Sequence, residues 1–478
     1  MVFDGPASVL AVSLTPTLSR REREQKQAPS TMKVRFAPSP TGLLHVGNAR
    51  IALANYLLAK RHGGQFLLRL DDTDTERNRP EYEDAIPYDL RWMGLSWDET
   101  FRQSDRLDHY AAAAEKLKAS GRLYPCFESE EELAAKRDQR AKRHQPPLYD
   151  RAMLKLTPEQ RAKAEAGGKR PYWRFLLSGY PAEWGDMVLG PRSVKLTAVS
   201  DPVLIRADGT PLYTFTSVVD DLESGITHIV RGEDHVTNTG IQIDIMAALN
   251  AGRAGRPSLP RFAHLPLLVD GDGGKLSKRI GALSIRSLRG DGIEPVALTG
   301  YLARLGTSDD PAPEAPDVMA QTYDLSRVSH SAARFDGTQL LALNRRVLHG
   351  LPFEAVQDRL PPAATPAFWN AIRGNLDFLR EAKGWWEVVA GSIVPPVLEG
   401  EADFLGQALQ ALPPEPWTNQ VWPDWTDALK AASGRKGKRL FLPLRQALTG
   451  EDHGPELRDL LPLMGRTRAE ERLRLAAA

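Results

Sequence analysis

The chain has 478 residues, which exceeds the usual size of one domain and predicts roughly three. Its 42% hydrophobic and 26% charged residues exclude collagen-like, low-complexity and largely disordered proteins, and no apolar run reaches the roughly 20 residues of a membrane span. Lysine and arginine number 62 against 61 acidic residues, so binding to a polyanion must come from local patches.

The single cysteine, Cys126, permits no intrachain disulfide, no thiolate zinc site and no iron–sulfur cluster, and it fits a reducing compartment. Composition therefore predicts a cytoplasmic protein of several domains without a membrane segment. Residues 1–31 differ from the rest, because their apolar stretch precedes the basic run 20–24, the reverse of a secretory signal. We expect this stretch to be a disordered tail or a spurious extension, with Met32 as the true start.

From Met32 the pattern predicts a strand, a loop, a helix and a second strand. A short apolar run at 34–36 ends in a loop rich in proline and glycine, and helical periodicity follows over 45–61. The strand QFLLRL at 65–70 then runs into the acidic segment 71–74. This βαβ order requires a parallel sheet, whose ligands bind outside the carboxyl ends of the strands.

The middle of the chain, about 100–200, is charged and broken by prolines, and it reads as an insertion. The pattern returns to the sheet with strands at 203–205 and 226–230. A glycine-rich loop at 270–274 precedes KLSKR, and Pro295 begins a predicted helix. After a proline-rich linker at 309–316 the sequence is mostly helical and carries six of the ten tryptophans, which predicts an α-helical region of its own.

Several residues carry chemistry by their type and place. His45 stands at a predicted helix N-terminus, where backbone N–H groups and the helix dipole favour an anion, although capping alone would also explain a histidine there. The cations of KLSKR suit phosphoryl or nucleotidyl transfer, but a solvated charge run has the same appearance. Arg35 and Arg231 flank strand ends and suit a carboxylate. Neither a dinucleotide fingerprint nor a P-loop motif is present.

The order of these motifs resembles a known family. PSPTGLLHVGNAR at 38–50, RGEDH at 231–235 and KLSKR at 275–279 resemble the paired signatures of class I aminoacyl-tRNA synthetases, and the specific similarity is to the bacterial glutamyl type. Supporting stretches are RFAPSPTG at 35–42, DTD at 72–74, DGTPLYTF at 208–215, VVDD at 218–221, PLL at 266–268 and GRKGKRLFLPLRQALTG at 434–450.

The resemblance implies an α/β plus α fold: a Rossmann-type parallel sheet with an inserted α/β domain that binds the tRNA acceptor stem, followed by an α-helical anticodon-binding domain. The expected ranges are 32–130 and 200–250 for the catalytic domain, 131–199 for the insertion, 251–324 for a stem-contact region with the KLSKR loop, and 325–478 for the anticodon-binding domain. The implied activity is ATP-dependent attachment of glutamate to tRNA, with ATP and Mg²⁺, without zinc, by a monomer.

The resemblance also implies roles for single residues. Catalysis and ATP binding fall on His45 and Lys278, with further ATP contacts at Gly47, Asp234, Leu268 and Lys275. The glutamate positions are Arg35, Ser39, Asp71, Tyr213, Ser217 and Arg231. A basic patch for the tRNA backbone is expected at Arg435, Lys436, Lys438 and Arg439, where a solvated loop is the alternative.

The sequence departs from the family at the amino-acid pocket. Asp71 replaces a glutamate expected to bind the substrate amine, and Ser217 replaces a common asparagine. An enzyme that prefers tRNA-Gln is therefore the alternative function. Three rivals have less support: a glutaminyl enzyme, a truncated paralogue that modifies a tRNA base, and a non-catalytic RNA-binding protein.

Overall fold

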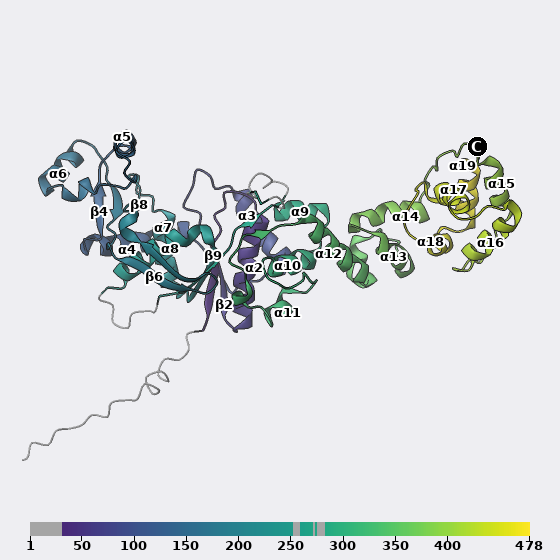
Figure 1. Cartoon of the computed structure of the whole chain (residues 1–478), viewed down its shortest axis with the longest axis horizontal. Coiled ribbons are helices and arrows are strands. Elements are labelled where there is room, and N and C mark those ends of the chain that lie inside the picture. Colours follow the sequence, from purple (N-terminus) through teal and green to yellow (C-terminus); the bar gives the residue numbers. More distant parts are fainter. Residues whose placement is uncertain (1–30, 252–258, 271–272, 275–282) are drawn as a thin grey trace, which may run out of the picture.

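The computed structural model describes residues 31–251, 259–270, 273–274 and 283–478. The molecule is elongated, with the inserted unit at one end, the sheet and helix α2 in the middle, and helices α14–α19 at the other end (Figure 1). In the described part of the chain, no helix is long and apolar enough to cross a membrane.

The predicted βαβ unit is confirmed. Strand β1 (Lys33–Phe36), helix α2 (Val46–Arg61) and strand β2 (Gln65–Leu70) follow each other, and the two strands pair in parallel from Lys33↔Gln65 to Phe36↔Leu68. Strand β3 (Glu99–Arg102) extends this sheet in parallel beside β2, after helix α3 (Pro80–Trp92).

A second sheet continues the first. Its order is β7 (Gly190–Lys195), β6 (Pro181–Asp186), β10 (Arg261–Leu265) and β9 (His228–Gly232). Strands β9 and β10 are parallel, and the Thr227 amide donates to the Lys33 carbonyl at 2.9 Å, which joins β9 to β1. The apolar run after the DGTP turn forms helix α7 (Tyr213–Glu223), and α8 (Val236–Leu249) packs beside it. The predicted parallel sheet is thus built from both halves of the chain's catalytic part.

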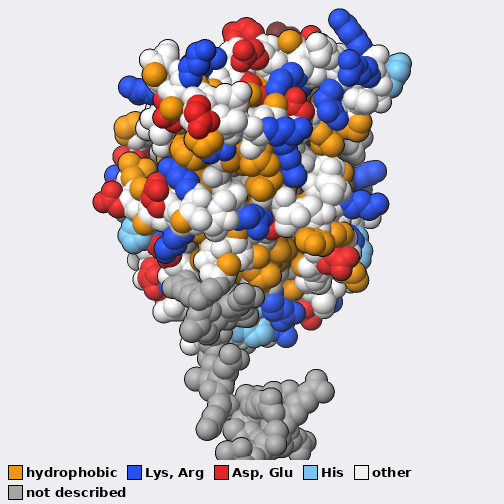
Figure 2. Space-filling view, turned by 90° about the vertical axis from the view of Figure 1, so that its left-hand side faces the viewer, with side chains coloured by type: hydrophobic (Ala, Val, Ile, Leu, Met, Phe, Trp, Pro, Cys, Tyr) orange, Lys and Arg blue, Asp and Glu red, His pale blue; other side chains and the backbone are white. Residues whose placement is uncertain are grey.

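The inserted unit has its own antiparallel sheet, formed by β4 (Leu123–Cys126), β5 (Tyr172–Phe175) and β8 (Val203–Ile205). Helices α4 (Leu107–Ala119), α5 (Glu130–Lys142) and α6 (Pro158–Ala166) accompany it. The predicted insertion, 131–199, does not coincide with the residues that form the inserted sheet. Strands β6 and β7 fall inside that range but belong to the sheet of β9 and β10, because β6 satisfies the hydrogen bonds of the β10 edge. Figure 2 looks onto this end of the molecule and shows basic side chains spread between acidic and hydrophobic ones.

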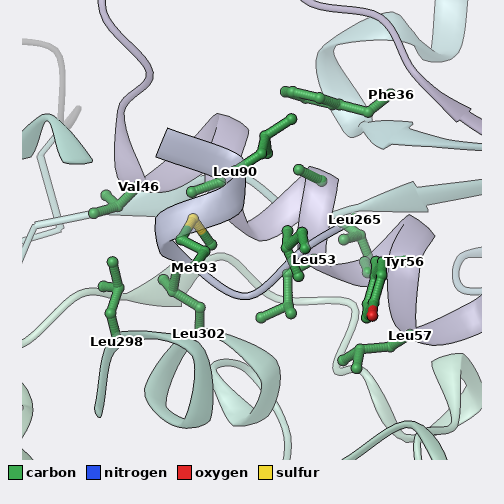
Figure 3. Close-up of a cluster of buried hydrophobic side chains, with 14 of the residues drawn as sticks. Phe36, Val46, Leu53, Tyr56, Leu57, Leu90, Met93, Leu265, Leu298 and Leu302 are labelled. Atoms are coloured by element: carbon green, nitrogen blue, oxygen red, sulfur yellow. The ribbon is translucent and has the colours of Figure 1, made fainter. Parts of the chain in front are cut away.

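Helix α2 positions the site because it is buried on nearly all sides. Its residues Val46, Leu53 and Leu57 pack against α3 and α10 side chains such as Leu90 and Leu298, as Figure 3 shows. Burying a side chain of this size contributes roughly 1.5–3 kcal/mol. This packing fixes the N-terminus of α2, which faces the carboxyl ends of the strands.

The rest of the chain is mostly helical, as predicted. Helix α10 (Pro295–Arg304) begins at the predicted proline. One short strand, β12 (Ala333–Arg334), falls inside the region expected to be helical and pairs in parallel with β11 (Leu268–Val269). The remaining helices are α9 (Ile285–Asp291), α11 (Pro316–Ala320), α12 (Gly337–Gly350), α13 (Pro366–Ile372), α14 (Ala382–Ala390), α15 (Ala402–Gln410), α16 (Val421–Ser433), α17 (Lys438–Thr449), α18 (Leu457–Met464) and α19 (Arg466–Ala476).

Candidate active site

A pocket of about 330 Å³ opens at the carboxyl ends of β1, β9 and β10. Of the residues predicted for ATP or glutamate, it is lined by His45, Gly47, Asp234, Leu268, Arg35, Tyr213 and Arg231. These residues come from four separate stretches of sequence, and the parallel sheet brings them together in the way expected for such folds.

His45 caps helix α2. Its Nδ1 accepts hydrogen bonds from the backbone N–H groups of Gly47 at 3.1 Å and Asn48 at 3.4 Å. Burial lowers the pKa of His45, so the ring is neutral and carries its proton on Nε2. The capping explanation and the anion-binding explanation are therefore compatible, because the capping nitrogen and the donor nitrogen are different atoms.

The opposite wall comes from β9 and β11. Leu268 and its neighbour Leu267 supply an apolar surface, and Asp234 follows β9 with its side chain 57% exposed. Arg50 of α2 donates to the carbonyls of Pro266 at 2.8 Å and Leu305 at 2.9 Å, which holds the segment before Leu268 against the helix.

The two predicted arginines differ in their partners. Arg35 donates from Nε to Asp221 at 3.1 Å, so its charge is compensated inside the protein. Arg231 is buried and donates to neutral groups: Tyr213 Oη at 3.3 Å, Thr239 Oγ1 at 2.5 Å and Gln242 Oε1 at 2.7 Å.

No carboxylate of the described residues forms an ion pair with Arg231. Burial, with Arg35 nearby, lowers its pKa, but a guanidinium remains charged at neutral pH. An uncompensated buried cation is unfavourable unless an anion reaches it. The pocket wall at Arg231 therefore suits a carboxylate ligand.

His235 lies beside this cation and completes the wall. Its ring centroid is 5.7 Å from that of Tyr213. Burial lowers the pKa of His235 to about 4, with repulsion from Arg231 adding to the effect. The ring is neutral at neutral pH and adds no charge to the pocket.

Three predicted glutamate residues do not line the pocket. Ser39 is exposed in the loop after β1. Ser217 is fully buried and bridges α7 and α8, since it donates to the Tyr213 carbonyl at 2.6 Å and accepts from Gln242 at 2.7 Å. Ser217 thus contacts the pocket-lining Tyr213, and it is linked to Arg231 through Gln242.

Asp71 is buried and also does not line the pocket. Both of its oxygens accept from the buried Arg69, at 2.6 and 3.1 Å, and the same guanidinium donates to Asp221 at 2.9 Å. Burial raises the pKa of Asp71 to about 6 against the opposing effect of Arg69. The short aspartate side chain reaches its arginine neighbour and not the crevice.

Other predicted residues are placed less directly. Lys275 and Lys278 lie outside the described residues. Lys436, in the turn between α16 and α17, and Lys438 and Arg439, in the first turn of α17, are exposed. Arg435 is paired with Glu401 and stacks on Phe404. Three members of the expected basic patch are thus available to solvent.

Within the described residues no group of three His, Cys, Asp or Glu side chains is arranged to hold a metal ion. Cys126 is buried in the inserted sheet, with its sulfur 3.6 Å from the Tyr149 hydroxyl, and burial raises its pKa to about 11. The thiol is protonated at neutral pH, which does not favour metal binding.

Two buried residues behind Arg231 were missed by the sequence analysis. His264 of β10 and Asp186 of β6 form a hydrogen-bonded pair at 2.5 Å, and His264 also contacts Arg231. His264 stands four residues before Leu268, and Asp186 falls in the predicted insertion. No local sequence pattern could have indicated that Asp186 and His264 are in contact, because the contact depends on the pairing of β6 with β10.

Comparisons with known proteins identify the family of this chain. Residues 31–342 match the family described as class I tRNA synthetases (E and Q), catalytic domain, and residues 398–477 match an anticodon binding domain. The chain is 65% identical to glutamate–tRNA ligase 2 of Gluconacetobacter diazotrophicus over 446 residues, 93% of this chain and 100% of that protein. It is equally similar to glutamate–tRNA ligase 2 of Acidiphilium cryptum, over 93% of this chain and 100% of that one.

Solved structures give the same result. The fold matches the crystal structure of a glutamate tRNA ligase from Elizabethkingia meningosepticum in complex with its amino acid, with a TM-score of 0.83 and 27% identity. The match covers 94% of this chain and 99% of that one. A glutamate–tRNA synthetase from Elizabethkingia anophelis matches with a TM-score of 0.82 and 26% identity over 94% of this chain.

Proposed function

This chain belongs to the class I tRNA synthetases of the glutamate and glutamine type, and we propose that it acts as a glutamate–tRNA ligase through the pocket between His45 and Arg231. ATP would lie over the βαβ crevice, with its phosphates at the N-terminus of α2 and its base and ribose against Leu268 and Asp234. The glutamate side-chain carboxylate would meet Arg231 and Tyr213, with Arg35 close by.

The reaction needs no nucleophile from the protein. An oxygen of the glutamate α-carboxylate attacks the α-phosphorus of ATP, the bond to the bridging oxygen breaks, and pyrophosphate leaves. A terminal ribose hydroxyl of tRNA then attacks the glutamyl carbonyl and AMP leaves. His45 Nε2–H would donate to a phosphate oxygen, and Lys278 is proposed to stabilise the leaving charge.

Magnesium would be held mainly through phosphate oxygens, since Mg²⁺ commonly binds with few protein ligands and the described residues offer no cluster of three. When bound, it neutralises phosphate charge.

The observation that carries the proposal is the buried guanidinium of Arg231 without an ion-pair partner among the described residues, on the wall of the pocket that also contains the His45 cap. Within one pocket, Arg231 thus suits a carboxylate and the N-terminus of α2 suits a phosphate. An amino acid with an acidic side chain, activated by ATP, satisfies both groups.

For tRNA, we propose that the inserted unit contacts the acceptor stem. A groove of about 320 Å³ on this unit is lined by Arg137, Arg140, Arg143 and Arg174. The helices from 325 onward would contact the anticodon. The enzyme is proposed to work as a monomer in the cytoplasm, with tRNA-Glu as substrate and tRNA-Gln as the alternative or additional one.

Two assays test the proposal. Pyrophosphate exchange, run with and without tRNA, should depend on glutamate, and aminoacylation of purified tRNA-Glu and tRNA-Gln should show which is charged. Arg231→Gln should raise the KM for glutamate roughly 10–100-fold, because it removes a charged hydrogen-bonding partner, and leave the KM for ATP nearly unchanged. An unchanged KM for glutamate would contradict the assignment of Arg231.

A further inference from the structure

Behind Arg231 the structure contains a chain of buried polar groups that the proposed reaction does not use directly. Arg231 donates to Thr239 Oγ1 at 2.5 Å, and Thr239 lies 2.8 Å from His264 Nε2. His264 Nδ1 in turn lies 2.5 Å from Asp186 Oδ2. Thr239 and His264 are fully buried, and Asp186 is 6% exposed.

The direction of each hydrogen bond is set at Asp186. Its Oδ1 accepts from the backbone N–H groups of Val188 at 3.1 Å, Leu189 at 3.0 Å and His264 at 3.1 Å, and its Oδ2 accepts from Trp184 Nε1 at 3.2 Å. A carboxylate surrounded by donors remains ionised. Hydrogen bonds from His264 and Leu189 outweigh the effect of burial and lower the pKa of Asp186 to about 2.

Because Asp186 only accepts, His264 must carry its proton on Nδ1 and present Nε2 as an acceptor. Burial also lowers the pKa of His264, which keeps the ring neutral. Nε2 then accepts from the Thr239 hydroxyl, and from Arg231 Nε at a longer 3.4 Å. The opposite tautomer would point an N–H at the guanidinium.

We propose that Asp186 and His264 are positioning residues for glutamate binding: they keep an acceptor at His264 Nε2 and so hold Arg231 with Nη1 at the pocket. This inference rests on the proposed function, in which Arg231 meets the substrate carboxylate. It also assigns a role to strand β6, which lies in sequence between β5 and β8 of the inserted unit but carries Asp186 into the sheet of β9 and β10.

Two substitutions at one position separate the acceptor from the donor. In His264→Gln the side-chain amide oxygen reaches the place of Nε2, so the acceptor is kept while the bond to Asp186 is lost. In His264→Asn the amide nitrogen can still donate to Asp186, but nothing reaches Arg231. We expect His264→Asn and Asp186→Asn to raise the KM for glutamate on the order of tenfold, with the KM for ATP unchanged. His264→Gln should restore a KM for glutamate within roughly threefold of the parent.

The measurement is pyrophosphate exchange by the full chain in the presence of tRNA, with Trp184→Phe as the matched control. That control removes one donor to Asp186 without interrupting the chain to Arg231, and its KM values should not change. A structural role alone would lower kcat or the amount of folded enzyme and would not separate the two KM values.

Equal KM values for glutamate in the parent and both Asn variants, or a Gln variant no better than the Asn variant, would overturn the inference. If Arg231→Gln also leaves the KM for glutamate unchanged, the proposed function fails at this residue. If Arg231→Gln raises the KM for glutamate but His264→Asn and Asp186→Asn do not, only the positioning role of His264 and Asp186 fails.

Discussion

Gly47 allows the imidazole of His45 to lie against the first turn of α2. A Cβ atom at this position would stand 2.8 Å from His45 Cε1 and 3.0 Å from Nδ1, closer than nonbonded atoms approach. The side chain that caps the helix and donates toward the phosphate site therefore requires a glycine two residues later.

We predict that Gly47→Ala displaces His45 and raises the KM for ATP roughly tenfold, which corresponds to the loss of about one charge-assisted hydrogen bond. Pyrophosphate exchange at varied ATP concentration measures this effect. Gly384→Ala, at an exposed position of α14 with open space around it, is the control and should change neither KM. Equal KM values for ATP in Gly47→Ala and Gly384→Ala would contradict the role assigned to Gly47.

His228 of β9 makes stability depend on pH. Burial lowers the pKa of His228 to about 4, and Arg261 adds repulsion, whereas an unfolded histidine titrates near about 6.5. Between these two values the unfolded chain binds a proton that the folded chain does not, so stability falls as pH decreases through this window.

We therefore expect the thermal unfolding midpoint to decline less steeply between about pH 7 and about pH 5 in His228→Gln than in the parent. Calorimetry over this range provides the comparison, with the exposed His330→Gln as control. Parallel curves for the parent and His228→Gln would show that this histidine does not contribute.

At the scale of elements, Arg472 of α19 joins the ends of two other helices. Its guanidinium donates to the carbonyls of Val388 at 2.5 Å and Leu448 at 2.8 Å, in the last turns of α14 and α17, and to the Gly391 carbonyl at 3.1 Å. Burial lowers the pKa of Arg472 to about 10. A cation suits these carbonyls because helix C-termini carry partial negative charge.

Arg472→Met should destabilise the C-terminal helices by roughly 2–4 kcal/mol, since it keeps most of the side-chain volume and leaves three carbonyls unpaired. Urea unfolding followed by tryptophan fluorescence reports on this region, which holds six of the ten tryptophans. Arg474→Met on the exposed side of α19 should stay within about 0.5 kcal/mol of the parent. A similar small effect for Arg472→Met would refute this account.

Element prediction succeeded where the signal is local. Pro295 begins α10 as expected, and the periodicity of 45–61 matches α2 to within one residue. Strand pairing was harder, because β6 and β7 carry nothing in their sequence that distinguishes an inserted strand from an edge strand of the main sheet. Asp71 illustrates the same limit for a side chain, since its orientation depends on Arg69, whose guanidinium also donates to Asp221 of α7.

At the scale of the molecule, the inserted unit and the C-terminal helices, which we propose contact tRNA, lie at opposite ends of an elongated body (Figure 1). Lys436, Lys438 and Arg439 are exposed between α16 and the start of α17, at the C-terminal end of the elongated molecule. The net charge of +1 leaves such local clusters as the source of attraction for tRNA.

We predict that the double substitution Lys436→Glu and Lys438→Glu weakens tRNA binding roughly tenfold at low salt and reduces the salt dependence of affinity, because phosphate contacts release counterions. Filter binding over a range of salt concentrations tests this. Lys383→Glu, an exposed lysine of α14, is the control for a general change of charge. If the dependence of affinity on salt concentration is unchanged in the double variant, Lys436 and Lys438 do not contact tRNA phosphates.

The sequence by itself determined the family, the βαβ core, the helical C-terminal region and seven of the residues that line the pocket. These features follow from local periodicity, turn chemistry and motifs with their order in the chain. Tertiary structure alone decided which predicted residues line the pocket and which lie outside its lining. Arg35 is compensated by Asp221 while Arg231 has no ion-pair partner among the described residues, and Asp186 reaches His264 only because β6 pairs with β10. These differences arise from contacts between segments that are far apart in the sequence, so no local sequence pattern reveals them.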